Sequence, residues 1–223
     1  MQGFRFLIYY DVGDLMTIFS LIVRGGILMY VLLVISVIVL GIVIEKYRQF
    51  RKVKRANLNL KTALSQQDKT ENISSILSMY DNSCPLSVML DKLFNSPTSN
   101  LDLINQSMES AANLQLHELE RGMGWLSTFA AIAPLIGFLG TVIGMVNVFM
   151  NIQGQSQSGV DISMLAGGIW VALLTTIGGL IVGIVTIIFY NDLVQQLENI
   201  VKDMQDAAVD YVIKYDAMTK GIK

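Results

Sequence analysis

Two sets of small and hydroxyl-bearing residues recur at helical spacing in this sequence, and they are its best candidates for chemistry. Each set advances in steps of 3 and 4 and so occupies one helix face: Ala172, Thr176, Gly179, Gly183 and Thr186 in one set, and Pro134, Gly137, Thr141 and Gly144 in the other. Threonine hydroxyls and backbone carbonyls can coordinate a cation or hydrogen-bond to water. Pro134 adds a carbonyl without its usual helical donor. The pattern suggests hydroxyl stations for an ion at Thr141 and Thr176, on a surface along which a partner's helix could slide.

The same residues fit a plainer interpretation, in which they only let helices pack closely. Gly140 and Gly144, and likewise Gly179 and Gly183, are separated by three residues, a spacing that lets two helix backbones approach each other. A threonine in such a helix can donate its hydroxyl to its own backbone. Taken alone, the residue pattern favours this packing interpretation.

No ionisable side chain accompanies these hydroxyls. Residues 25–44, 122–160 and 162–191 contain no Asp, Glu, Lys, Arg or His, although such a residue usually marks a proton relay in a membrane. The chain alone is therefore expected to have no proton carrier. The sequence has no phosphate-binding loop, catalytic triad or metal-ligand spacing, so neither an enzyme nor a bound cofactor or metal is expected. Cys84 and His117 are each the single residue of their kind, and His117 is expected on the surface.

Three charge-free spans must position these residues, and they predict an all-α integral membrane protein with three transmembrane helices. The composition, 52% hydrophobic and 15% charged, is wrong for a soluble domain. Residues 25–44 match the roughly 20 residues that a helix needs to cross the hydrocarbon core. Further crossings are expected at 122–152 and 165–191, joined by a turn at 153–164. A hairpin buried in a large soluble fold is the disfavoured alternative, and a net charge of −2 gives no basic field for nucleic acid.

The distribution of basic residues orients the chain. The turn at 153–164 has no basic residue. Six basic residues follow the first crossing, against the single acid Glu45: Lys46, Arg48, Arg51, Lys52, Lys54 and Arg55. Because basic loops stay in the cytoplasm, we expect a periplasmic N-terminus and a cytoplasmic C-terminus, with these cations also placed to contact anionic lipid. Residues 1–24 contain Asp11 and Asp14 and no cleavage site, which favours an interfacial helix on the periplasmic side.

The cytoplasmic parts, 45–121 and 192–223, are expected to be helical. Two apolar faces at helical spacing predict short helices: Ile73, Ile76, Leu77 and Tyr80, and Leu86, Met89, Leu90 and Leu93. A longer helix is expected to start at a cap, Ser99 or Asn100, and to run straight on into the second crossing. The tail predicts a heptad seam that extends the third crossing: Val194, Leu197, Val201, Met204, Ala208 and Tyr211. Its partner helix could belong to this chain or to another subunit.

Three stretches of the chain resemble the signature of the MotA/TolQ/ExbB proton-channel family, and most of all its ExbB/TolQ branch. They are APLIGFLGTVIGMVNVF at 133–149, LAGGIWVALLTTIGGL at 165–180 and YN at 190–191. The resemblance is detailed over the second and third crossings and agrees with that branch's layout over the whole chain. MotA-type subunits have four crossings, whereas three are expected here.

The resemblance implies a stator-like ion-channel subunit of a motor in the bacterial inner membrane, driven by the proton motive force. In the family, five such subunits enclose the single helices of two ExbD/TolR-type partners, whose membrane aspartate carries the proton. By resemblance, the chain forms a homopentamer, and Thr141 and Thr176, with Thr175 beside the latter, lie on the path of H⁺. A TonB-like or TolA-like protein would transmit the work, in the ExbB branch to TonB-dependent outer-membrane transport.

The sequence departs from the family pattern at two positions of the third crossing. Val171 stands where the family often has a glutamate, and Val185 where it often has a proline. Since hydroxyls and carbonyls can also coordinate Na⁺, a sodium-driven variant stays open. Two further alternatives are a TolQ-like role in envelope integrity and cell division, and a non-conducting membrane scaffold.

Overall fold

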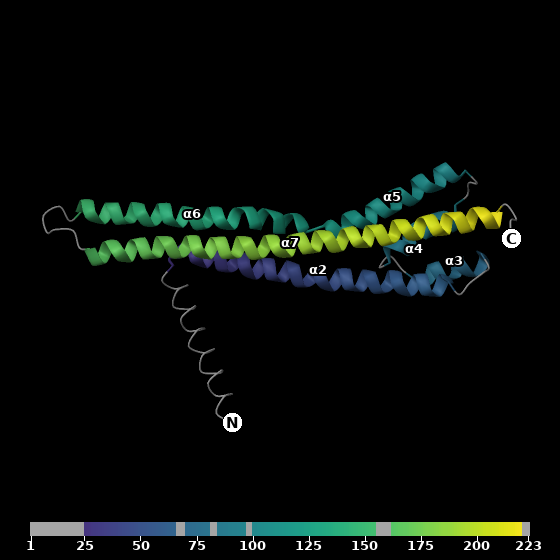
Figure 1. Cartoon of the computed structure of the whole chain (residues 1–223), viewed down its shortest axis with the longest axis horizontal. Coiled ribbons are helices and arrows are strands. Elements are labelled where there is room, and N and C mark those ends of the chain that lie inside the picture. The colour runs from purple at the N-terminus through teal and green to yellow at the C-terminus, as the bar shows by residue number, and fades with distance from the viewer. Residues whose placement is uncertain (1–24, 66–69, 81–83, 97–99, 155–161, 220–223) are drawn as a thin grey trace, which may run out of the picture. The chain divides into compact units, whose positions relative to one another are not determined.

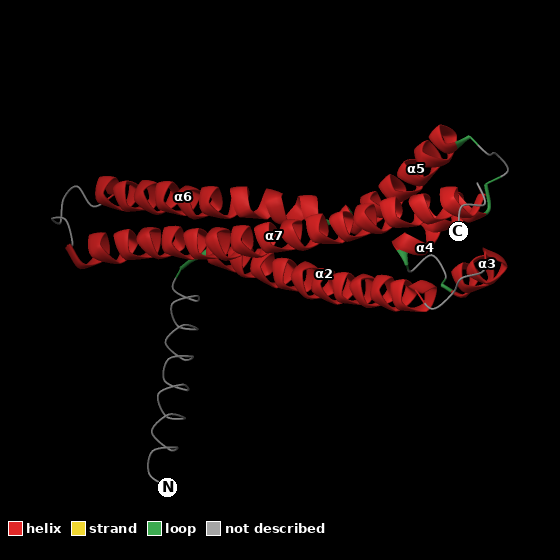
Figure 2. Ribbon diagram, turned by 45° about the vertical axis from the view of Figure 1, so that its right-hand side comes forward, coloured by secondary structure: helices red, strands yellow, loops and turns green. Residues whose placement is uncertain are grey.

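The computed structural model describes residues 25–65, 70–80, 84–96, 100–154 and 162–219. Within these ranges all regular structure is helical, as Figure 2 shows: α2 (Ile27–Ser65), α3 (Thr70–Met79), α4 (Pro85–Phe94), α5 (Leu101–Glu120), α6 (Met123–Gly154) and α7 (Ile162–Thr219). The predicted all-α class is therefore confirmed. The predicted interfacial helix at 1–24 and the middle of the predicted turn at 153–164 lie outside the described residues.

Three helices in the described part of the chain are long and apolar enough to cross a membrane. They are Ile27–Ser65, Met123–Gly154 and, within α7, Leu165–Ala217. A helix suits this environment because it satisfies its own backbone hydrogen bonds where water is absent. The chain is thus an integral membrane protein with three candidate crossings. The residues at which each crossing ends stay predictions.

Close contacts divide the chain into two units. The first consists of Met1–Ile42 with Trp125–Tyr190, and the second of Val43–Gly124 with Asn191–Lys223. Helices α2, α6 and α7 each contribute residues to both units. Among the described residues, the charged side chains all belong to the second unit.

In the first unit, α6 and α7 lie side by side and α2 lies along α7 (Figure 1). The buried side chains come from all three helices: Leu32, Ile35, Val39, Leu126, Ala133, Val148 and Ala172. Large apolar side chains also cover the outside, where Phe138 is 63% and Ile177 is 53% exposed. An outer surface as apolar as the interior is expected for helices surrounded by lipid or by other transmembrane helices.

In the second unit, one face of α2 is buried in steps of 3 and 4 residues: Val43, Lys46, Phe50, Val53, Asn57, Leu60 and Leu64. The predicted apolar faces of the two short helices also point inward. Ile73 and Leu77 of α3 are buried, as is the whole predicted set of α4: Leu86, Met89, Leu90 and Leu93. Sequence periodicity was sufficient here because each short helix has a single apolar face to bury.

Asn57 ties α2 to the start of α4. Its Oδ1 accepts a hydrogen bond from the Cys84 thiol at 3.3 Å and lies 3.5 Å from the Leu86 amide nitrogen, which also donates to it. Burial raises the pKa of the Cys84 thiol. The thiol is therefore protonated at neutral pH and acts as a structural donor rather than as a nucleophile.

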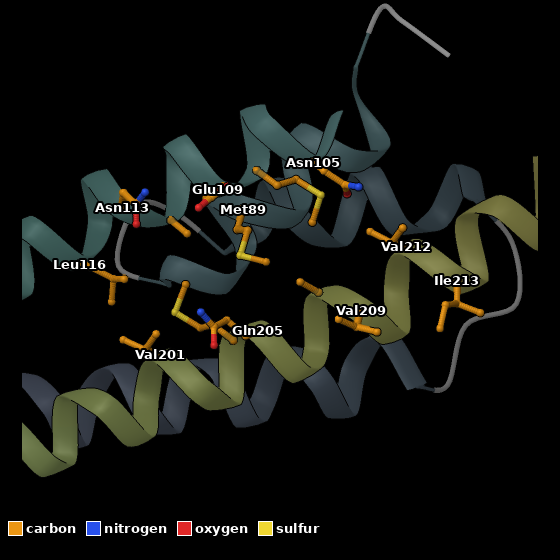
Figure 3. A pocket seen from close by; sticks show the side chains of 14 residues that line it. Met89, Asn105, Glu109, Asn113, Leu116, Val201, Gln205, Val209, Val212 and Ile213 are labelled. Atoms are coloured by element: carbon orange, nitrogen blue, oxygen red, sulfur yellow. The ribbon is translucent and has the colours of Figure 1, made fainter. Parts of the chain in front are cut away.

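The tail of α7 confirms two residues of the predicted heptad seam, Leu197 and Met204, but its other buried residues differ from the predicted ones. Its buried residues are Leu193, Leu197, Ile200, Met204 and Ala207, whereas four of the six predicted residues are only half-buried: Val194, Val201, Ala208 and Tyr211. Two of these four, Val201 and Ala208, line a groove of about 450 Å³ between α5 and α7, into which Gln205 and Val209 also point (Figure 3). Adjacent seams share the same spacing, so periodicity could not choose between them. Part of the partner is in the same chain, since Lys61 of α2 donates to the Asp203 carbonyl at 2.9 Å.

The predicted uninterrupted helix from residue 100 into the second crossing was also wrong. Asn100 is the N-cap of α5, its Oδ1 accepting from the Asp102 amide at 3.0 Å, but α5 ends at Glu120 and α6 begins at Met123. Between them, Arg121 is extended with ψ 125° and Gly122 has φ +89°. This left-handed backbone is readily adopted by glycine and not by residues with a Cβ. Two residues, Arg121 and Gly122, therefore separate the two helices, and the left-handed glycine sets the break.

We predict that Gly122→Ala lowers the stability of the protein by about 1 kcal/mol, because an alanine at this φ brings its Cβ too close to the backbone. Gly124→Ala is the matched control. Gly124 lies in the first turn of α6, and a Cβ added there would have nothing within 4 Å, so this change is expected to be neutral or slightly stabilising. Thermal unfolding of both variants in the same detergent checks the prediction, and equal midpoints would contradict it.

Candidate ion-conducting site

The site is built on a very close approach between the backbones of α6 and α7. A Cβ at Gly179 would lie 2.6 Å from the Ala133 carbonyl oxygen and 2.8 Å from the Gly137 Cα. A Cβ at Gly137 would lie 2.9 Å from the Thr175 carbonyl oxygen. These separations are shorter than van der Waals contact and involve backbone atoms that cannot move aside. Glycine is therefore required on both helices at this level.

The same contact continues in both directions along the helices. Toward one end, a Cβ at Gly140 would lie 2.7 Å from the Thr175 Cβ, and one at Gly144 would lie 2.8 Å from the Ala172 Cβ. Toward the other, a Cβ at Gly183 would lie 2.7 Å from the Pro134 Cγ. The structure thus brings all the predicted small residues together: Pro134, Gly137, Gly140, Gly144, Ala172, Gly179 and Gly183. Within one chain they are the packing residues of α6 against α7, and their role toward a partner stays a prediction.

Two of the three predicted threonines, Thr175 and Thr176, contact α6, and the three differ in accessibility. Thr175 is 2% exposed, and its hydroxyl donates to the Ala172 carbonyl at 2.8 Å. Thr176 is half-buried, and its hydroxyl donates across the helix pair to the Gly137 carbonyl at 3.0 Å. Thr141 is half-buried and donates to the Phe138 carbonyl at 2.6 Å. Thr141 and Thr176 therefore have accessible surface, whereas Thr175 has almost none.

These hydrogen bonds limit what the hydroxyls can do. Each hydroxyl proton is used by a backbone carbonyl, so in this state the oxygens can accept hydrogen bonds or coordinate a cation but cannot donate. Thr176 can turn away without leaving an unpaired carbonyl, because Gly137 lies inside α6 and its carbonyl keeps the regular helical bond from Thr141 N–H. The Thr176 hydroxyl thus reaches α6 at the Gly137 carbonyl, whereas the Thr141 hydroxyl bonds to the Phe138 carbonyl of its own helix.

The two departures from the family pattern have different surroundings. Val171 lies near Gly26, just before α2, since a Cβ added at Gly26 would be 3.8 Å from the Val171 Cγ1. Val185 is 45% exposed on the outside of α7.

Lys46 has a role that sequence reasoning missed. It was grouped with the topology-determining cations, but it is only 5% exposed, and its ammonium donates to the Leu119 carbonyl at 3.0 Å and to Gln49 Oε1 at 2.8 Å. Leu119 belongs to the last turn of α5, where carbonyls lack helical donors and a cation is favoured. Lys46 therefore caps α5. The signal was present in the sequence, since Val43, Lys46 and Phe50 follow the 3 and 4 spacing of the buried face.

The residue next to Lys46 holds α7. The Tyr47 hydroxyl donates a short hydrogen bond to Asp192 Oδ2, and the Gln196 amide donates to the same oxygen at 2.6 Å. Adjacent residues of α2 thus bind two different helices of the second unit, α5 through Lys46 and α7 through Tyr47. In the described part of the chain, no three His, Cys, Asp or Glu side chains lie close enough together to hold a metal ion.

Comparison with known proteins identifies the family. The model of the MotA/TolQ/ExbB proton channel family matches residues 81–206, which include α4, α5, α6 and the site. This chain belongs to that family. It is 28% identical to the biopolymer transport protein ExbB of Salmonella typhimurium over 76% of this chain and 71% of that one. It is 35% identical to the Tol-Pal system protein TolQ of Haemophilus influenzae over 44% and 42% of the two chains.

These relatives also confirm the ExbB/TolQ branch. An ExbB homolog of Methanothermobacter thermautotrophicus is 24% identical over 82% of this chain, and the match spans 65% of that relative. In this ExbB/TolQ-branch protein, the close contact of α6 with α7 and all three threonines lie within the family match.

For this contact we predict that Gly179→Ala destabilises the protein by about 1 to 3 kcal/mol, since the added methyl group forces two backbones apart. Gly167→Ala in the same helix is the control, because a Cβ added there would have nothing within 4 Å. Thermal unfolding and size-exclusion profiles of the two variants are compared. If Gly179→Ala is as stable as Gly167→Ala, the backbones are not in contact here.

For the α5 cap we predict that Lys46→Met lowers stability by about 1 to 2 kcal/mol, because it leaves the Leu119 carbonyl without its buried donor. Lys52→Met removes an exposed charge from the same helix and is expected to change stability by less than about 0.5 kcal/mol. The unfolding midpoints of both variants in detergent provide the measurement. Equal midpoints would show that Lys46 acts only through its charge.

Proposed function

We propose that this protein is an ion-conducting subunit of an energy-transducing complex of the bacterial inner membrane, coupled to the proton motive force. The observation that carries the proposal is the pair of accessible hydroxyls, Thr141 and Thr176, on a helix pair whose described residues carry no charge within the first unit. Family membership supports the channel class. Membrane crossings without any ionisable group need a carboxylate from elsewhere if protons are to pass.

We assign that carboxylate to a single-helix partner of the ExbD/TolR type. An ionised aspartate in hydrocarbon costs at least about 2.5 kcal/mol, so it stays protonated against an apolar surface and ionises only beside polar groups. At this site, Thr176 can turn its hydroxyl from the Gly137 carbonyl to the carboxylate, and Gly137 keeps its helical bond. The charged state of the partner would thus be stabilised by a hydroxyl that exchanges one acceptor for another.

The energy available sets how many ions a mechanical step of the proposed motor requires. One ion crossing about 100 mV releases roughly 2.3 kcal/mol, so a sizeable mechanical step requires several ions. We therefore propose repeated protonation of two partner helices inside a homopentamer of this chain, with a periplasmic N-terminus and a cytoplasmic C-terminus. No cofactor takes part.

Among the possible outputs we propose TonB-dependent outer-membrane transport through a TonB-like protein. The name of the Salmonella relative, which covers more of this chain than the TolQ relative does, supports this choice. A TolQ-like role with a TolA-like protein is the second candidate. We propose H⁺ rather than Na⁺ as the conducted ion. The resemblance places three threonine hydroxyls on the ion path, but Thr175 is buried and its hydroxyl is bound to its own helix. Few oxygens are then left to enclose a bare cation.

The test is ion flux in proteoliposomes that contain this chain and its single-helix partner. Thr176→Val keeps the shape of the side chain and removes the hydroxyl, and we expect it to lower proton flux at least about tenfold. Replacing the partner's membrane aspartate by asparagine is expected to lower proton flux to a similar extent. Thr186→Val is the control, because Thr186 is 1% exposed and donates to the Val182 carbonyl in its own helix.

Flux that is unchanged in Thr176→Val, or lowered equally in Thr186→Val, would contradict the role of Thr176. If the intact wild-type complex moves neither H⁺ nor Na⁺ under an applied potential, the scaffold alternative is correct. Replacing the proton gradient by a sodium gradient separates the two ions.

A further inference from the structure

Five of the six cations that follow the first crossing have no hydrogen-bond or ion-pair partner within the described residues. Lys46 is buried and bound to the end of α5, whereas the other five are exposed: Arg48, Arg51, Lys52, Lys54 and Arg55. Glu45 is the one acid of α2 in this region. The sequence placed six equivalent cations here, and the structure separates one structural lysine from five available charges.

Four of these charges form a continuous surface on α2, which we call the basic stripe: Arg48, Arg51, Lys52 and Arg55. They recur at steps of 3 and 4 residues and so share one helix face. The buried residues Phe50, Val53 and Asn57 occupy the opposite face of the helix. The basic stripe therefore points outward from the second unit, with Lys54 at its flank.

The basic stripe begins where lipid headgroups are expected. Arg48 follows Ile44, the last residue of the predicted crossing, by four residues, or about 6 Å along the helix. Arg55 follows it by about 16 Å. The polar layer extends roughly 5 to 8 Å beyond the hydrocarbon, and charges act over a Debye length of about 8 Å beyond that. The whole basic stripe thus lies within reach of headgroup phosphates.

We propose that the basic stripe binds the phosphate groups of anionic phospholipids in the cytoplasmic leaflet. Three of its four residues are arginines, whose planar guanidinium groups can donate two parallel hydrogen bonds to one phosphate. The proposal assigns these residues a ligand beyond their effect on topology. It does not depend on ion conduction.

A second copy of the chain offers a competing acidic surface, that of α5. This helix has four acids and no Lys or Arg: Asp102, Glu109, Glu118 and Glu120. These acids are spread over 19 residues, about 27 Å from first to last, whereas the basic stripe is about 10 Å long. The spacing of charges therefore favours a surface of closely placed phosphates over an α5 helix.

The test measures the association of spin-labelled phosphatidylglycerol, relative to spin-labelled phosphatidylcholine, with the full chain in phosphatidylcholine vesicles. The wild type is expected to prefer phosphatidylglycerol, and Arg48→Gln with Lys52→Gln is expected to lower this preference at least about fivefold. The control, Lys92→Gln with Lys202→Gln, removes two exposed charges from α4 and α7 and is expected to keep it. Lys46, Arg51, Lys54 and Arg55 remain to hold the topology of the test variant.

Two further arms use the wild type and do not depend on the folding of a variant. Raising NaCl from about 0.01 M to about 1 M, which shortens the Debye length from about 30 Å to about 3 Å, should abolish the preference. Inorganic phosphate at the same ionic strength as a NaCl control should not displace the lipid more than NaCl does. Displacement by phosphate alone would instead indicate a site for free phosphate.

Three results would overturn the proposal. The first is a wild type without preference, or with a preference that salt does not change. The second is an equal loss in the control variant, which would indicate a general charge effect. The third is that the double variant, Arg48→Gln with Lys52→Gln, keeps its lipid preference while its oligomer dissociates. That result would show that the basic stripe binds α5 of a second copy of the chain.

Discussion

The close approach of α6 and α7 is the constraint on which the rest of the first unit depends. At Gly137 and Gly179 the two backbones leave no room for a Cβ, so the helices are fixed in register by contact rather than by side-chain shape. This register places the Thr176 hydroxyl 3.0 Å from the Gly137 carbonyl, to which it donates. A larger residue at either glycine would separate the Thr176 hydroxyl from the Gly137 carbonyl. Packing and chemistry are therefore two consequences of one geometry.

In the second unit, α2 plays the organising part through two adjacent polar residues. Lys46 binds the end of α5 and Tyr47 binds α7 through Asp192, while the buried 3 and 4 pattern around them supplies the apolar contact. Burying a lysine is costly unless its protons are used, and here carbonyl and amide oxygens use them. The polar contacts specify which helix lies where, because apolar faces alone accept neighbours in more than one register.

Much of this arrangement could be predicted from the sequence, and the errors have a common cause. The three crossings, the faces of α3 and α4 and the Asn100 cap follow from local pattern, since each is decided within a few residues. The seam of α7 was correct at Leu197 and Met204 but one residue away at Val194, Val201 and Ala208, because Leu193 and Val194 begin equally regular patterns through the two shared residues. The break at Gly122 was missed because a glycine in a helical pattern is compatible with a helix or with its end.

The sequence by itself determined that this is an all-α membrane protein, that no charge enters its crossings, and which threonines and glycines share a helix face. These properties depend on hydropathy and on helical periodicity, which are local. Only the tertiary structure decided that the two small-residue faces meet each other, that Thr175 is buried while Thr176 bridges two helices, and that Lys46 caps α5 while its neighbouring cations stay exposed. Those outcomes depend on which helices become neighbours, and residues 73 positions apart, such as Lys46 and Leu119, meet only after the chain has folded.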